Sequence, residues 1–439
     1  NNPSYKSEEG ILYDKKGETL IACPMAKTDS ITLPSTVKKI EDYAFFNCIF
    51  LVNINIPDSV TTIGHGAFNN CKSLVNITIP ESVTSLGGSL FNGCISLESV
   101  TLPSTTTAIS DYMFKDCGRL SGFVIPQNVN YIGEKAFYNC ASLTNITIPQ
   151  SVTSIGDSAF FGCAELTGVI IPNNVVSIGT EAFKNCTKLA AVTIGKKVMN
   201  IGERAFENCG YLRSIEVAID NDYFTSIDGI LYNEDVTRII ACPKGKTGSI
   251  VIPNTVTVID DRTFLGCDKI TEITLGENVQ KIGENAFEGC AELVTLNIPS
   301  SVTFIGQAAF KDCAKLTYEQ YENCSYIGDW LIKANDTDIS TLVIKEGTRY
   351  IYYCAFLDCV NLTNVTLPET IISIGNYSFY GCTGLITVTL NNGLISIGNR
   401  AFNNCTSLTT LNIPDSVTSI GLYAFTNSNN LTYVEYGNA

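Results

Sequence analysis

The segment Ile146–Leu166, ITIPQSVTSIGDSAFFGCAEL, sets the pattern for nearly the whole chain. The pattern returns every 23 residues as I-x-I-P-x-x-V-x-x-I-G-x-x-A-F-x-x-C-x-x-L-x-x. A fixed period of about 20 to 29 residues is typical of a solenoid, in which each unit buries its apolar side only by stacking on its neighbours. We therefore predict a repeat solenoid, α/β to mainly β, which offers a surface to partners rather than an active-site pocket.

Within one repeat, the β-branched alternation of Ile146–Ile148 predicts a strand, and Pro149 ends it because proline lacks a backbone N–H. Gly156 permits a turn, and the spacing of Ala159–Cys163 predicts a single helical or 3₁₀ turn. Strands one period apart can stack only in parallel, so we predict a horseshoe or arc with one continuous parallel sheet and short helical turns on its convex side. The side chains predicted to fill the core are those of Ile146, Ile148, Val152, Ile155, Ala159, Phe160, Cys163 and Leu166.

Irregular segments divide the predicted single solenoid, which covers all 439 residues, into three blocks. Residues 1–219 hold a hairpin cap and eight repeats. Residues 220–318 hold an inserted hairpin and three repeats, and residues 319–439 hold a degenerate period and four repeats.

The first hairpin is predicted from strands at Ile11–Tyr13 and Thr19–Cys23, which flank a polar turn. It recurs, because residues 220–253 align with residues 1–34 without a gap and 15 of the 34 positions are identical. The degenerate period, which contains Trp330, resembles a third copy. We interpret the hairpins as spacers or caps, and the alternative is that they are landmarks on a binding surface.

Composition excludes several classes of partner. Apolar residues make up 45% of the chain and charged residues 16%, and the formal net charge is −15. An acidic chain does not suit nucleic acid or anionic membrane surfaces, which need clustered Lys and Arg. No apolar run approaches the ~18 residues of a membrane span. The chain starts at Asn1 without an export signal, so we expect any such signal to lie outside this sequence.

The chain has 18 cysteines, and most of them share one repeat position. A zinc site needs ligands that converge in pairs such as C-x2-C, and this sequence has none. We interpret the repeated cysteines as a ladder of small buried thiols, with some disulfide pairing as the alternative. The final repeat carries Ser428 there. The ladder positions are Cys48, Cys71, Cys94, Cys117, Cys140, Cys163, Cys186, Cys209, Cys267, Cys290, Cys313, Cys359, Cys382 and Cys405. The cysteines off the ladder are Cys23, Cys242, Cys324 and Cys354, and the last is a candidate for exposure.

Nothing in the sequence points to catalysis. His65 is the only histidine, so it has no second histidine for a metal site or a proton relay, and we expect it in an exposed turn. The ladder cysteines are accompanied by no repeated base that would activate them as nucleophiles. No phosphate loop, HExxH or GxSxG motif is present. We therefore predict that the chain is not an enzyme and holds no cofactor or metal.

The positions L-x-x-I-x-I-P and A-F-x-x-C resemble the BspA-type subclass of leucine-rich repeats over essentially the whole chain. Pro149 and Val152 replace the asparagine step of the common leucine-rich consensus, so no asparagine ladder is expected. The resemblance implies a bacterial cell-surface or secreted protein that contacts host proteins, matrix or other microbes. A right-handed parallel β-helix is the main competing fold, and the A-F-x-x-C turn without a third strand-like segment weighs against it.

The exposed side of the predicted sheet is the candidate binding surface. Strand alternation directs Asn145 and Thr147 outward while their isoleucine neighbours point inward. Most outward positions are small and polar, but Val124 and Ile170 are apolar. In each of these two strands, the preceding outward position is a glycine. Val124 and Ile170 form a docking patch or reflect drift on an unused face. The candidate partner-binding residues are Val124, Asn145, Thr147, Ile170, Tyr232 and Trp330.

Two functions fit these observations. The first is a non-enzymatic, monomeric cell-surface or secreted protein that binds or adheres to a host extracellular or matrix protein, another microbial partner, or a glycan. The alternative is a structural stalk or spacer of a larger cell-wall protein.

Overall fold

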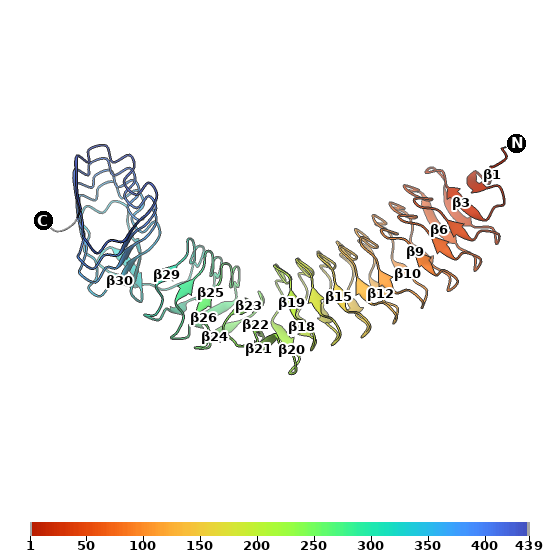
Figure 1. Ribbon diagram of the computed structural model, residues 1–439, viewed down its shortest axis with the longest axis horizontal. Coiled ribbons are helices and arrows are strands. Elements are labelled where there is room, and N and C mark those ends of the chain that lie inside the picture. The colour runs from red at the N-terminus through yellow and green to blue at the C-terminus, as the bar shows by residue number, and fades with distance from the viewer. Residues whose placement is uncertain (1, 437–439) are drawn as a thin grey trace. The chain divides into compact units, whose positions relative to one another are not determined.

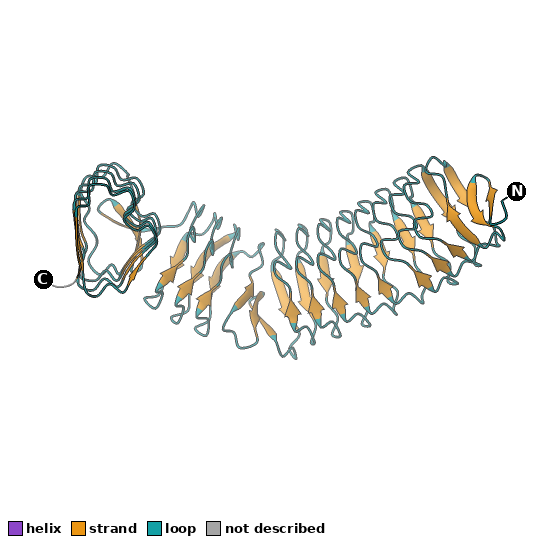
Figure 2. Cartoon of the chain, turned by 45° about the horizontal axis from the view of Figure 1, so that its top comes forward, coloured by secondary structure: helices purple, strands orange, loops and turns teal. Residues whose placement is uncertain are grey.

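The computed structural model describes residues 2–436, and these residues form strands joined by turns, without a helix (Figure 2). The predicted repeat solenoid is confirmed, and it is mainly β. The chain divides into two compact units, Asn1–Thr247 and Gly248–Ala439, and the boundary falls just after the second hairpin. Within residues 2–436 no helical segment could cross a lipid bilayer.

Each standard repeat, or rung, contributes two short strands that stack on those of the neighbouring rungs (Figure 1). In the first unit, the strands at the I-x-I positions are β4 (Asp29–Thr32), β6 (Leu51–Asn55), β8 (Asn76–Thr78), β10 (Ser99–Thr101), β12 (Gly122–Val124), β14 (Asn145–Thr147), β16 (Gly168–Ile170), β18 (Ala191–Ile194) and β20 (Ser214–Val217). In the second unit they are β24 (Gly248–Val251), β26 (Ile270–Thr274), β28 (Thr295–Asn297), β34 (Asn364–Thr366), β36 (Thr387–Thr389), β38 (Thr410–Ile413) and β40 (Tyr433–Tyr436).

A second column of two-residue strands ends at the position of Ile155, which is isoleucine in every one of these strands except β9, where it is Leu86. In the first unit these are β5 (Lys39–Ile40), β7 (Thr62–Ile63), β9 (Ser85–Leu86), β11 (Ala108–Ile109), β13 (Tyr131–Ile132), β15 (Ser154–Ile155), β17 (Ser177–Ile178) and β19 (Asn200–Ile201). In the second unit they are β25 (Val258–Ile259), β27 (Lys281–Ile282), β29 (Phe304–Ile305), β33 (Tyr350–Ile351), β35 (Ser373–Ile374), β37 (Ser396–Ile397) and β39 (Ser419–Ile420).

Both columns are parallel and in register, since Ile155 pairs with Ile178 and Phe123 pairs with Ile146, each one period apart. The expectation of one continuous sheet is corrected, because the pairing is divided into several sheets in two columns. In the I-x-I column of the first unit, the breaks precede β12 and β16. These strands begin with Gly122 and Gly168, and glycine weakens a strand because it has no side chain to pack.

The segment Ala159–Cys163 is not the predicted helical turn. The residues at its edges, Ser158 and Gly162, adopt left-handed φ angles of 52° and 72°. As a result, alternate N–H groups leave the turn: Phe160 N–H donates to the next rung's Ala182 carbonyl at 2.8 Å. A helix would keep these bonds within the segment. Alternate hydrogen bonds therefore join rungs, while those between them close single turns, as when Cys163 N–H donates to the Phe160 carbonyl at 3.2 Å.

Gly156 is needed for a different reason from the one expected. Its φ is not in the left-handed region, but a Cβ atom there would lie 2.7 Å from the backbone nitrogen of Glu134 and the carbonyl carbon of Gly133. Adjacent rungs approach too closely at this step to admit a side chain. The glycine of the I-G step thus sets the stacking distance between rungs rather than the turn.

The interior of each rung is built as predicted. All eight core side chains assigned between Ile146 and Leu166 are buried. The phenylalanines stack from rung to rung, with ring centroids 5.1 Å apart and planes 4° apart for Phe137 and Phe160. Rings stacked at this separation stabilise the fold beyond the contribution of their burial. The repeat position therefore becomes a continuous aromatic ladder along each block of standard rungs.

The 14 repeated cysteines are buried free thiols, as the ladder interpretation predicts. Cys140 shows the usual arrangement, in which its Sγ donates to the carbonyl of Phe114 in the preceding rung at 3.1 Å. Ser428 keeps the same bond, donating from Oγ to the Phe402 carbonyl at 3.0 Å. The side chain at this position thus links neighbouring rungs. Of the cysteines off the ladder, Cys354 is half-buried rather than exposed.

Three irregular segments share one antiparallel topology. Their strands are β1 (Tyr5–Glu8), β2 (Ile11–Asp14) and β3 (Thr19–Ala22), then β21 (Phe224–Ile227), β22 (Ile230–Asn233) and β23 (Ile239–Ala241), then β30 (Glu319–Tyr321), β31 (Cys324–Ile327) and β32 (Trp330–Ala334). The first and third join the solenoid, because β3 pairs in parallel with β5 and β32 with β33. The degenerate period is therefore a third copy of the hairpin.

Candidate functional site

The structure places four of the predicted binding residues on the outward face of the first unit. Val124 and Ile170 are 83% and 69% exposed, among the most exposed large apolar side chains of residues 2–436. Asn145 and Thr147 are exposed on β14. The register pairs Val124 with Thr147 on neighbouring strands, and Ile170 occupies the same position one rung further. We call Val124, Thr147 and Ile170 the apolar patch.

Two glycines leave open space beside the apolar patch. Neither Gly122 nor Gly168 has a left-handed φ. A Cβ atom at Gly122 would meet nothing within 4 Å, and one at Gly168 would meet only the Ala191 carbonyl oxygen, at 3.7 Å. The backbone therefore does not require glycine at either position. Because glycine has no side chain, the backbone next to Val124 and Ile170 is left uncovered, and a partner's side chain can reach it.

The other two predicted residues do not belong to this surface. Tyr232 is 0% exposed and Trp330 is 6% exposed. Tyr232 lies on β22, in which Ile230 and Leu231 are also buried, so strand alternation directs none of the three outward. Trp330 stacks on Tyr350 with the ring centroids 4.4 Å apart. Both candidates are corrected: the two side chains are buried rather than exposed to a partner, and that of Trp330 packs its hairpin against Tyr350 of the solenoid.

Sequence reasoning overlooked two residues with the same exposure. Val251 on β24 is 70% exposed and Val343 is 54% exposed. Each takes the middle position of an I-x-I or L-x-I motif, as Val124 and Ile170 do. The signal was therefore present, because reading the same column through the repeats that begin at Ile250 and Leu342 would have found them.

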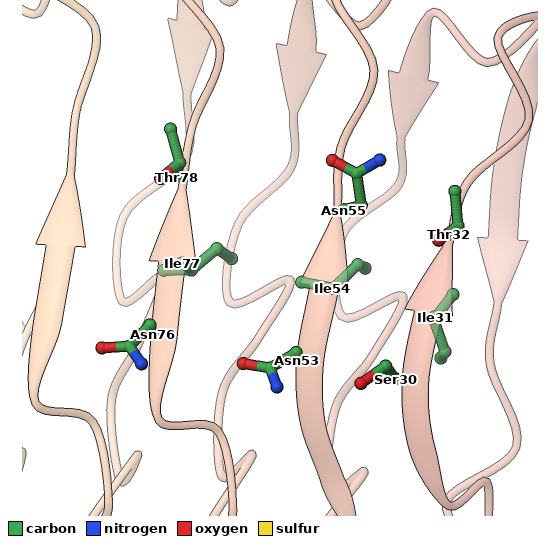
Figure 3. Close-up of a pocket in the computed structure, with 9 residues that line it drawn as sticks. All are labelled: Ser30, Ile31, Thr32, Asn53, Ile54, Asn55, Asn76, Ile77 and Thr78. Atoms are coloured by element: carbon green, nitrogen blue, oxygen red, sulfur yellow. The ribbon is translucent and has the colours of Figure 1, made fainter.

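A second feature of the outward face lies near the N-terminus of the first unit. A shallow groove of about 280 Å³ crosses β4, β6 and β8 (Figure 3). Polar side chains line it in two rows, one before and one after the buried isoleucine of each strand, as Figure 3 shows. The first row is Ser30, Asn53 and Asn76, and the second row is Thr32, Asn55 and Thr78.

Burial makes the ladder thiols Cys71 and Cys209 poor nucleophiles. Burial raises the pKa of Cys71 and of Cys209 to about 12, so the thiolate that would act as a nucleophile is not formed near neutral pH. In the described part of the chain, no group of three His, Cys, Asp or Glu side chains converges to hold a metal ion. His65 is exposed, as expected, and its ring packs edge-on against Tyr43.

Comparison with known proteins identifies the repeats. The family model of the BspA type leucine rich repeat region matches residues 23–141, 107–230, 242–361 and 349–439. No curated protein matches the chain.

Solved structures resemble the chain along most of its length. One is a leucine rich cell surface protein from Faecalibacterium prausnitzii, with 25% identity, a TM-score of 0.49, and coverage of 89% of this chain and 95% of that one. Another is a leucine-rich repeat protein from Bacteroides ovatus, with 24% identity, a TM-score of 0.43, and coverage of 98% and 91%. Because the family model covers nearly all of the sequence, the chain belongs to the BspA-type leucine-rich repeat family.

Proposed function

We propose that this chain is a non-catalytic binding protein of a bacterial cell surface or of the secreted fraction, and that its apolar patch docks a protein partner. The observation that carries the proposal is the exposure of Val124 and Ile170 on a sheet face of the first unit whose other outward positions are mostly small and polar. Exposed apolar side chains cost free energy in water, and two of them close together on one face support an interaction site. Membership of the BspA-type family supports the cell-surface location.

The geometry favours a protein over other partners at this patch. Val124 and Ile170 lie two rungs apart, about 10 Å at the usual spacing between strands. Thr147 between them offers a hydroxyl, and the bared strands at Gly122 and Gly168 offer backbone groups. Apolar side chains combined with hydrogen-bonding groups are the usual composition of a protein interface. The net charge of −15 favours a partner with a basic or neutral face.

The test is binding of the full chain to a panel of purified extracellular-matrix proteins, measured by biolayer interferometry. The double variant Val124→Asp, Ile170→Asp is expected to lose at least tenfold in affinity, because each carboxylate would have to be desolvated in the interface. The matched control is Thr101→Asp, Thr193→Asp, which adds the same charge at the same outward positions of β10 and β18. Equal binding by the parent and the patch variant would contradict docking at this patch and would move attention to the hairpins, whereas no binding by the parent would favour the stalk alternative.

A further inference from the structure

We propose that the polar groove across β4, β6 and β8 binds a neutral β-1,4-linked glycan chain that runs across the strands, from rung to rung. The groove lies on a different part of the outward face from the apolar patch, so this proposal does not depend on the protein partner. It rests on three properties of the groove: the hydrogen-bonding capacity of its walls, its lack of charge, and its spacing.

The walls of the groove have unused hydrogen-bonding capacity. All six polar side chains are exposed, and each row places one amide or hydroxyl on every rung. Within the described chain, Asn76 is the only one of the six with a side-chain hydrogen bond, which its Oδ1 accepts from the Ser99 hydroxyl at 2.6 Å. Asn53 and Asn55 on β6 therefore present donors and acceptors on both sides of the groove.

Some of the same outward positions elsewhere are bonded to one another. Thr387 donates to Asn364 on the neighbouring rung at 2.6 Å, and Ser249 donates to Glu272 at 2.9 Å. A polar side chain that bonds to its neighbour has less to offer a ligand. At the three rungs of the groove most of the polar groups remain available, and the hollow that they line gathers them along one path.

The groove carries no charge. Its nine lining residues are serine, threonine, asparagine and isoleucine. Acidic side chains stand on the same face in other rungs, at Glu216 and Glu272. An anionic ligand such as a phosphate or nucleic acid would find no cation in the groove to pair with it. A ligand rich in neutral hydroxyl groups, by contrast, matches amide and hydroxyl walls, since each of these groups both donates and accepts.

Spacing separates a glycan from an extended peptide. Neighbouring rungs are about 4.8 Å apart, and an extended β-1,4-linked glycan advances by nearly this distance for each sugar. One sugar can therefore meet one rung, with its two edges toward the two rows. A peptide strand along the same path repeats its outward groups at about 6.6 Å, which falls out of step with the rungs. The three rungs thus form a site for about three consecutive sugars.

The experiment is isothermal titration calorimetry of the full chain with three soluble hexasaccharides: β-1,4-linked glucose, β-1,4-linked N-acetylglucosamine, and α-1,4-linked glucose as the geometric control. We expect one or both β-linked probes to bind and the α-linked probe to bind at least tenfold more weakly, because its chain coils and cannot follow the rungs. The two β-linked arms distinguish an unsubstituted glycan from an N-acetylated one.

Matched variants locate the site. The double variant Asn53→Ala, Asn55→Ala is expected to lose at least tenfold in affinity for the β-linked probe. The control Thr387→Ala, Thr389→Ala truncates the corresponding positions of β36 and should bind as the parent does. Unfolding midpoints from circular dichroism would establish that both variants are folded. The proposal is overturned if neither β-linked probe binds, if the α-linked probe binds equally, or if the Asn53, Asn55 variant binds as tightly as the parent.

Discussion

The interior and the outward face of the same strands follow different rules. On β14, Ile146 points inward and belongs to a column that is apolar in every standard rung, while Thr147 points outward and has valine, isoleucine or asparagine at equivalent positions. Interior side chains must stack on near-identical neighbours one rung away, so their identity is narrowly constrained. Outward side chains meet solvent and vary without cost to stacking. Uniformity inside therefore reflects stability, and the outward face is where rungs can differ without losing it.

The largest expected effect is the loss of folding stability at alkaline pH, because the small contributions of many buried ladder thiols add up. Burial raises the pKa of each of seven ladder thiols in the first unit, and the folded state therefore favours the protonated form. Above the unfolded pKa of about 8.5, the unfolded chain loses these protons while the folded chain keeps them, so stability is full below this pH and falls as pH rises. The loss is about 2 kcal/mol per thiol at pH 10. The thiols are Cys71, Cys94, Cys117, Cys140, Cys163, Cys186 and Cys209.

Thermal unfolding followed by circular dichroism at pH 7 and pH 10 measures this loss. The control replaces Cys117, Cys140 and Cys163 with serine, which does not ionise in this range and can keep the inter-rung bond that Ser428 makes. The triple variant should lose less stability between the two pH values than the parent. An identical loss would show that the ladder thiols are not responsible.

One pair of variants compares the stability cost of truncating a side chain in the interior with the cost of truncating one on the outward face. Phe137 is fully buried between the rings of Phe114 and Phe160. Phe137→Ala should lower the free energy of unfolding by about 3–5 kcal/mol, because it removes the buried ring and leaves a cavity. Val124→Ala, on the exposed face of the same rung, should change it by no more than ~0.5 kcal/mol. Urea unfolding of both variants is the measurement, and comparable losses would contradict the distinction.

The smallest expected difference between the interior and the outward face comes from substituting two glycines. Gly156→Ala places a methyl group against the backbone of the preceding rung and should cost about 1–3 kcal/mol of unfolding free energy. Gly122→Ala on the outward face meets nothing within 4 Å and should change the unfolding free energy by no more than ~0.5 kcal/mol. Denaturation midpoints under identical conditions would decide the matter. A neutral Gly156 variant would show that the rungs can move apart at the I-G step.

Much of the candidate surface was predictable because strand alternation is a local property. Val124, Asn145, Thr147 and Ile170 could be placed outward from the I-x-I pattern alone, and the structure shows them exposed. Tyr232 and Trp330 were misplaced because their strands are buried on both sides, which depends on what packs over the hairpins. The groove at Asn53 and Asn55 was also beyond prediction. Its polar residues look ordinary in the sequence, and only the structure shows which of them lack side-chain partners.

The sequence by itself determined the period, the solenoid, the core of each rung and the buried cysteine ladder, because a 23-residue repeat with apolar side chains at fixed positions can bury them only by stacking. The tertiary structure alone decided how the rungs connect: the second column of strands, the left-handed residues such as Ser158, and the close approach at Gly156. These features depend on hydrogen bonds and contacts between residues one period apart. No single repeat contains both partners of such a contact, so the pattern within a repeat cannot specify its geometry.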